Sequence, residues 1–83
     1  MATKQKVIKL LDELGAMLIQ DPGKYDFEEI EILAPQGKFW ESNLCGVLCY
    51  EFDRHTMTKA ELWDEVLNDI EDGLVDDSEV GAL

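Results

Sequence analysis

Residues 57–70, MTKAELWDEVLNDI, contain the strongest local structural signal in the chain. Thr58 and Glu61 have the spacing of a capping box, in which each side chain accepts a hydrogen bond from the backbone N–H of the other residue. Met57 and Leu62 have the spacing of a hydrophobic staple across the same helix start. An apolar stripe follows at three- and four-residue spacing: Leu62, Trp63, Val66, Leu67 and Ile70. The segment therefore predicts an amphipathic helix that buries one face.

A second amphipathic pattern covers residues 3–20. Its apolar residues also recur at helical spacing: Val7, Ile8, Leu10, Leu11, Leu14, Met17 and Leu18. Thr3 is a suitable N-cap, and Asp21-Pro22-Gly23 ends the pattern because the residue before a proline is pushed out of the α region. We therefore predict a helix over residues 3–20, in which Gly15 costs about 1 kcal/mol relative to alanine and allows another element to approach closely.

Three shorter segments in the middle of the chain have the patterns of β-strands. Residues 28–34 alternate isoleucine with glutamate, and residues 38–41 follow the turn residues Pro35-Gln36-Gly37. Residues 44–52 make the longest apolar run of the three. Because the connections are short, sequence neighbours are expected to pair, which predicts a three-stranded antiparallel meander.

The element order is α-β-β-β-α, and each predicted helix has one apolar stripe to bury. The simplest arrangement packs both helices on one face of the meander, giving a two-layer α+β domain. We expect residues 1–73 to form this single domain, because 83 residues leave no room for a second one. Residues 74–83 are acidic and rich in small residues, and we expect them to fray as a C-terminal tail.

The composition restricts the classes of partner. The chain has 19 acidic against 7 basic residues, and its formal net charge is −12. Nucleic-acid-binding domains meet phosphates with clustered lysine and arginine, and anionic membranes attract basic segments. No apolar run approaches the roughly 20 residues of a membrane-spanning helix. We therefore expect neither direct nucleic-acid binding nor membrane docking.

The negative charge is concentrated on the second predicted helix and the segment after it. Residues 60–83 contain nine acidic residues and no lysine or arginine, whereas residues 1–59 contain 7 basic and 10 acidic residues. Such an array steers basic partners towards a surface. We predict that it binds a basic protein through six carboxylates: Glu61, Asp64, Glu65, Asp69, Glu71 and Asp72. The alternative is that the charge only keeps a small protein in solution.

The spacing of these carboxylates suggests one kind of basic partner. Residues four apart on a helix are separated by about 6 Å along its axis, which roughly matches the phosphate spacing along one DNA strand. Small acidic proteins that mimic DNA, including many phage-borne inhibitors of restriction or CRISPR enzymes, have a similar size and charge. No motif in this chain identifies such a family, so the analogy rests on size and charge alone. It favours an inhibitor or adaptor that takes the place of nucleic acid on a protein surface.

The predicted meander has a second face that two helices cannot reach. On residues 44–52, alternation places Leu44, Leu48, Tyr50 and Phe52 on the core side and Cys45, Val47, Cys49 and Glu51 on the other side. Neighbouring Phe39 and Trp40 must point to opposite faces, so one of them joins the open side. Exposed apolar patches usually mark contacts. As the alternative function we predict a homodimer through this open face, with Val47, Cys49 and one of Phe39 and Trp40 at the contact.

The sequence offers no catalytic constellation. Cys45, Cys49 and His55 lie on or beyond one predicted strand, which spreads them too far apart for a single metal ion. The two cysteines are also too far apart along a strand for a disulfide, and we expect them to be buried or half-buried. There is no glycine-rich phosphate loop and no nucleophile elbow. We therefore expect a cytoplasmic protein that needs no metal or cofactor and is not an enzyme.

Overall fold

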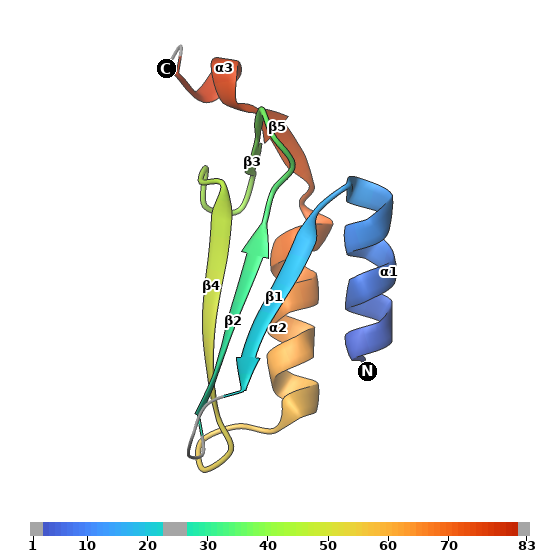
Figure 1. Cartoon of the computed structure of the whole chain (residues 1–83), viewed down its shortest axis with the longest axis vertical. Coiled ribbons are helices and arrows are strands. Elements are labelled where there is room, and N and C mark those ends of the chain that lie inside the picture. The colour runs from blue at the N-terminus through green and yellow to red at the C-terminus, as the bar shows by residue number, and fades with distance from the viewer. Residues whose placement is uncertain (1–2, 23–26, 82–83) are drawn as a thin grey trace.

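The structure is a computed structural model that describes residues 3–22 and 27–81 (Figure 1). These residues form three helices and two antiparallel sheets, which confirms the α+β class. The elements in chain order are α1 (Lys4–Leu14), β1 (Met17–Pro22), β2 (Phe27–Leu33), β3 (Lys38–Trp40), β4 (Val47–Asp53), α2 (Lys59–Glu71), β5 (Leu74–Asp76) and α3 (Asp77–Gly81).

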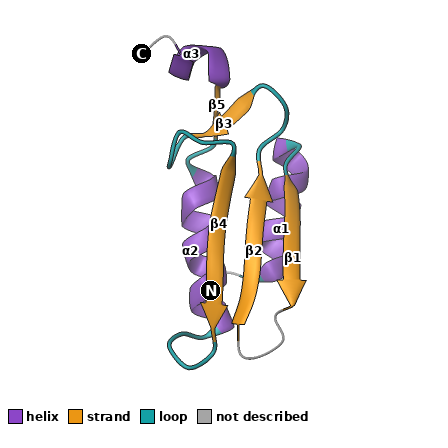
Figure 2. Cartoon of the chain, turned by 60° about the vertical axis from the view of Figure 1, so that its left-hand side comes forward, coloured by secondary structure: helices purple, strands orange, loops and turns teal. Residues whose placement is uncertain are grey.

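The main sheet has three strands in the order β1-β2-β4, and both neighbouring pairs are antiparallel. Helices α1 and α2 cover the same face of this sheet, as predicted (Figures 1 and 2). The composition of the sheet differs from the prediction, because β1 replaces the segment at residues 38–41 as the third strand. The register aligns Leu18, Ile32 and Leu48 across the three strands on the face towards the helices.

The predicted helix over residues 3–20 ends early, at Leu14. Gly15 adopts a left-handed conformation with φ 73°, and its N–H is directed at the carbonyls of Leu11 and Asp12. This geometry favours glycine, which has no Cβ to clash with the backbone, and it commonly ends helices. The chain reverses there, and Met17–Pro22 returns alongside the helix as strand β1. Gly15 is therefore a helix terminator rather than a mid-helix contact point.

Helix α2 begins as predicted. The backbone N–H of Glu61 donates to Thr58 Oγ1 at 3.1 Å, and the N–H of Thr58 donates to Glu61 Oε1 at 3.2 Å. The buried core joins α1, α2 and the main sheet, and Trp40 is part of it. Its members are Val7, Leu11, Ile30, Ile32, Trp40, Leu48, Phe52, Leu62, Trp63, Val66 and Ile70.

Strand β3 does not join the main sheet. It pairs with β5 in a small second sheet (Figure 2). In this sheet Trp40 is aligned with Leu74. Trp40 is fully buried, and its indole Nε1 donates to the carbonyl of Ile32 at 3.0 Å. The prediction of a tail that frays from residue 74 therefore does not hold for residues 74–81, which form β5 and α3.

The third predicted strand also begins later than expected, at Val47 rather than at residue 44. Leu44, which we placed on the core side, lies in a turn with φ 53° and is 46% exposed. Its backbone N–H donates to the carbonyl of Trp40 at 2.7 Å, so the turn folds back onto β3. Leu48 and Phe52 are buried, which confirms the predicted core side for the rest of the strand.

Replacing Gly15 with alanine distinguishes a turn at Gly15 from a continuous helix over residues 3–20, because the two structures predict opposite changes in the free energy of unfolding. In the left-handed conformation, Gly15→Ala should lower the free energy of unfolding by about 1–2 kcal/mol. In a continuous helix over residues 3–20, the same change would raise it by about 1 kcal/mol. The space is sufficient, since an added Cβ would lie 3.9 Å from Pro35 Cβ. Urea unfolding of both proteins gives the sign, and a stabilised variant would contradict the turn at Gly15.

Candidate partner-binding surfaces

The six predicted carboxylates of α2 do not have equivalent roles. Glu61 belongs to the capping box at the start of the helix. Asp69 is half-buried and accepts a hydrogen bond from the Tyr50 hydroxyl at 2.5 Å. The other four are exposed on α2 and the residue after it: Asp64, Glu65, Glu71 and Asp72. Sequence periodicity located the acidic helix, but the pairing of Asp69 with a residue 19 positions away required the tertiary structure.

The Tyr50–Asp69 hydrogen bond fixes α2 to strand β4. Partial burial raises the pKa of the Tyr50 hydroxyl well above its ordinary value, and the hydrogen bond to Asp69 and the nearby charges of Asp69 and Glu65 act in the same direction. The phenol therefore stays protonated at neutral pH and remains a donor. Glu65 and Asp69 consequently lie beside β4, at one edge of the main sheet.

The outer face of the main sheet carries further carboxylates. Glu29 on β2 is aligned directly with Glu51 on β4, and Glu31 is aligned with Cys49. All three glutamates are exposed. Like charges opposite one another destabilise a sheet, and β1, β2 and β4 contain no lysine or arginine to compensate them. Alternation in residues 28–34 indicated that Glu29 and Glu31 share a face, but their alignment with Glu51 depends on the strand register.

We group the carboxylates on the two sides of the β4 edge as the acidic surface: Glu29, Glu31 and Glu51 on the outer face of the sheet, and Glu65 and Asp69 on α2. It combines the outer face of the sheet with the side of α2 next to Tyr50. The structure thus extends the predicted acidic helix to a surface built from both layers of the domain.

Several basic side chains are engaged within the fold instead. Lys59 Nζ lies 3.6 Å from Glu28 Oε1 and 5.9 Å from the centre of the Phe52 ring. Glu28 also accepts a hydrogen bond at 2.7 Å from Gln20, which in turn accepts one at 2.6 Å from Lys4. Lys38 pairs with Asp76 across the small sheet, and this contact raises the pKa of Lys38. These lysines therefore hold elements together and do not neutralise the acidic surface.

The row of the outer sheet face at the other end is apolar: Met17 is 60% exposed, and Leu33 and Val47, aligned with it, are half-buried. In the next row, Ile19 (43% exposed) and the exposed Cys49 lie on either side of Glu31. The predicted self-association residues Val47 and Cys49 therefore do lie on the uncovered face. Both cysteines are free and exposed, contrary to the expected burial, since Cys45 lies in the loop before β4 and Cys49 points away from the helices.

The structure separates the two aromatic candidates for self-association. Trp40 is buried in the core and is not available to a partner. Phe39 is half-buried in β3, and its ring lies 3.8 Å from where a Cβ on Gly46 would stand, just before β4. Of the two residues between which the sequence left the choice open, Phe39 is therefore the one directed away from the core.

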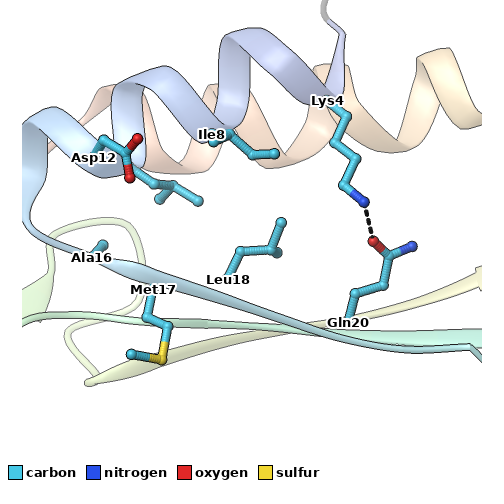
Figure 3. A pocket seen from close by; sticks show the side chains of 8 residues that line it. Lys4, Ile8, Asp12, Ala16, Met17, Leu18 and Gln20 are labelled. Carbon is cyan, nitrogen blue, oxygen red and sulfur yellow. Dashed lines mark hydrogen bonds between the residues drawn. The ribbon is translucent and has the colours of Figure 1, made fainter.

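A pocket of about 520 Å³ lies between α1 and the edge strand β1 (Figure 3). Leu18 points from β1 towards the helix, and Met17 points away from it. Ile8 extends from α1 into the space between the helix and the strand. Lys4 and its partner Gln20 stand at one end of the pocket and Asp12 at the other. The pocket is thus apolar in the middle and charged at both ends, a feature that sequence periodicity did not indicate because the helix was predicted to continue through β1.

The Tyr50–Asp69 hydrogen bond predicts a specific pH dependence. Tyr50→Phe removes the hydroxyl and should lower the free energy of unfolding by about 1–2 kcal/mol near neutral pH. Because the pKa of Tyr50 is raised by folding, its stabilisation is complete below about pH 10, the ordinary tyrosine pKa, and is lost as the pH rises further. Urea unfolding of both proteins between pH 7 and 11 should therefore show a difference that shrinks above about pH 10. A difference independent of pH would contradict this role.

Within the described part of the chain, no helix has the length and apolar character needed to cross a membrane. Among residues 3–22 and 27–81, no three histidine, cysteine, aspartate or glutamate side chains lie close enough together to hold a metal ion. Comparisons of the chain with models of protein families, with curated proteins and with solved structures found no match. Its function is therefore inferred from the geometry of its own surfaces.

Proposed function

We propose that this protein is a small acidic protein-binding module, an inhibitor or adaptor that engages a basic surface of a partner protein. The observation that carries the proposal is the acidic surface around the β4 edge, where carboxylates from the sheet and from α2 flank one strand. Uncompensated charge from two separate elements raises the local negative potential more than a single helix does. Such a potential accelerates the approach of a basic partner.

The structure supports a division of labour among the acidic residues. Glu61 and Asp69 stabilise the fold, through the capping box and the hydrogen bond to Tyr50. Glu65 and Glu51 are exposed on either side of β4 and make none of these contacts. We assign the direct contact with the partner to Glu65 and Glu51 together with Glu29 and Glu31. The exposed Asp64, Glu71 and Asp72 extend the same negative field along α2 and beyond its end.

The partner class that fits this surface is a protein whose own ligand is nucleic acid. Carboxylates about 6 Å apart on α2 approximate the spacing of phosphates along one strand, and the glutamates of the sheet supply a second row. In this function the protein binds in place of nucleic acid, without binding nucleic acid itself. It acts in the cytoplasm as a binding protein rather than as an enzyme and requires no cofactor.

A second candidate function is self-association through the apolar end of the outer sheet face. The large exposure of Met17 and Ile19, on the same face of the sheet as Val47 and Cys49, favours it. In that case the acidic residues serve solubility, and the homodimer is the functional unit of a structural or accessory protein.

Charge reversal at the β4 edge tests the acidic surface. The variant Glu51→Lys/Glu65→Lys changes two exposed carboxylates and leaves Tyr50–Asp69 and the capping box intact. With a partner captured on wild-type protein from the source cells, association with this variant should slow by about tenfold or more, because steering is lost. Rising salt should slow wild-type association in the same way. The stability of the variant should be unchanged or slightly higher, because Glu51 no longer opposes Glu29.

The matched control is Glu13→Lys/Glu41→Lys, which changes the net charge equally at two exposed positions outside the acidic surface. It should slow association much less than the first variant. If both variants slow association equally, only the net charge matters. If neither charge reversal nor salt changes the rate, the acidic surface has no binding role.

A further inference from the structure

The two edges of the main sheet differ in chemical character. The β4 edge is flanked by Glu51, Glu65 and Asp69, and charged side chains of this kind discourage another strand from pairing. The β1 edge pairs with no other strand in the described part of the chain. From Met17 to Gln20 it carries uncharged side chains, and the pocket against α1 opens beside it. The β1 edge is therefore the one suited to strand addition.

The backbone of β1 shows which groups face outward. Pro22, the last residue of the strand, has no N–H, and on edge strands a proline places its nitrogen on the unpaired side. Backbone groups alternate in direction along an antiparallel strand. The N–H and C=O groups of Leu18 and Gln20 are therefore directed away from β2 and available to another strand.

The face of α1 that lines the pocket has a matching polarity. Lys4, Ile8 and Asp12 are four residues apart and lie on this face, with the lysine at the N-terminal end and the aspartate at the C-terminal end (Figure 3). Ile8, between them, is 37% exposed. A second copy of this face, turned by 180° about an axis through the middle of the first, would present its Asp12 to Lys4 and its Ile8 to Ile8.

We propose that the β1 edge and the α1 pocket bind a second copy of the chain, with the two β1 strands antiparallel about a two-fold axis beside Ile19. In this register, Leu18 of each copy is opposite Gln20 of the other, and all the outward N–H and C=O groups of these residues are paired. Ile19 meets its own counterpart on the outer face. Leu18 of the second copy enters the apolar space beside α1. The main sheet becomes continuous across the dimer.

Electrostatics select the second copy as the occupant. Antiparallel β1 strands bring the two α1 helices alongside each other in opposite directions, so that the lysine end of each helix lies beside the aspartate end of the other. Helix α1 carries three lysines against two acidic residues, whereas α2 carries one lysine against five. Two copies of this acidic protein therefore repel least where their α1 helices meet. The contact is independent of the acidic surface at β4, so one can fail without the other.

A charge swap across the two-fold axis tests this contact. Sedimentation equilibrium of wild-type protein near physiological salt should show the mass rising with concentration from 9.4 kDa towards twice that value. Lys4→Glu and Asp12→Lys each turn both intermolecular pairs into repulsive ones, and each should weaken dimerisation by about tenfold. The double variant Lys4→Glu/Asp12→Lys restores opposite charges and should recover the wild-type dissociation constant within about threefold. Lys4→Glu places a negative charge at the N-terminus of α1, and Asp12→Lys places a positive charge near its C-terminus. Both charges interact favourably with the helix dipole, so α1 should remain folded, as circular dichroism would verify.

A second pair of variants separates edge pairing from packing through the open sheet face. Ile19 and Cys49 flank Glu31 in the same row of the sheet, one on each edge strand. Ile19→Lys places like charges together at the two-fold axis and should weaken the dimer by about tenfold. Cys49→Lys, at the distant edge, should leave it unchanged. The proposal is overturned if the wild type is monomeric at all concentrations, if the charge swap fails to rescue, or if Cys49→Lys weakens the dimer as much as Ile19→Lys.

Discussion

The architecture depends on the reversal of the chain at Gly15. The left-handed conformation of this residue ends α1 and returns the chain as β1, on the side of β2 opposite to β4. Without the reversal, β2 would have lost one of its two neighbours, and the inward row of Leu18, Ile32 and Leu48 could not form. The same reversal places α1 beside β1, which creates the pocket at that edge. One glycine thus determines the composition of the sheet and the location of its apolar edge.

The distribution of charge follows from how the two layers are held together. Lys59 and Lys4 connect helices to the main sheet through Glu28 and Gln20, and Lys38 joins the two strands of the small sheet. These three lysines therefore act as internal connections, while carboxylates accumulate on the outer face and along α2. This division explains how a chain with a net charge of −12 forms a two-layer domain and still presents a strongly acidic exterior. Its acidity is concentrated near β4 because the glutamates of β2 and β4 are aligned there and no basic residue of these two strands compensates them.

Local sequence signals predicted the parts of the structure that depend on local interactions. The capping box at Thr58 fixed the start of α2, because its hydrogen bonds span three residues. The segment after Gly15 could not be assigned in this way, since Met17 and Leu18 fit the helical period and also fit a strand. The pairing of β3 with β5 depends on contacts between residues 38 and 76, which no local pattern reveals. For the acidic surface, α2 was predictable from composition, but Glu51 and the structural role of Asp69 became apparent only from register and tertiary contacts.

The small sheet has a consequence for the order in which the molecule assembles and opens. Strands β1 and β2 are neighbours in sequence, whereas β3 and β5 are separated by β4 and the whole of α2. Closing a longer loop costs more chain entropy, so the β3–β5 pairing is expected to form after the main sheet and α2 are in place. The same pairing offers few hydrogen bonds, because each strand has three residues. Transient opening should therefore begin at this end of the molecule and briefly uncover the indole of Trp40, while the β2–β4 pairing persists.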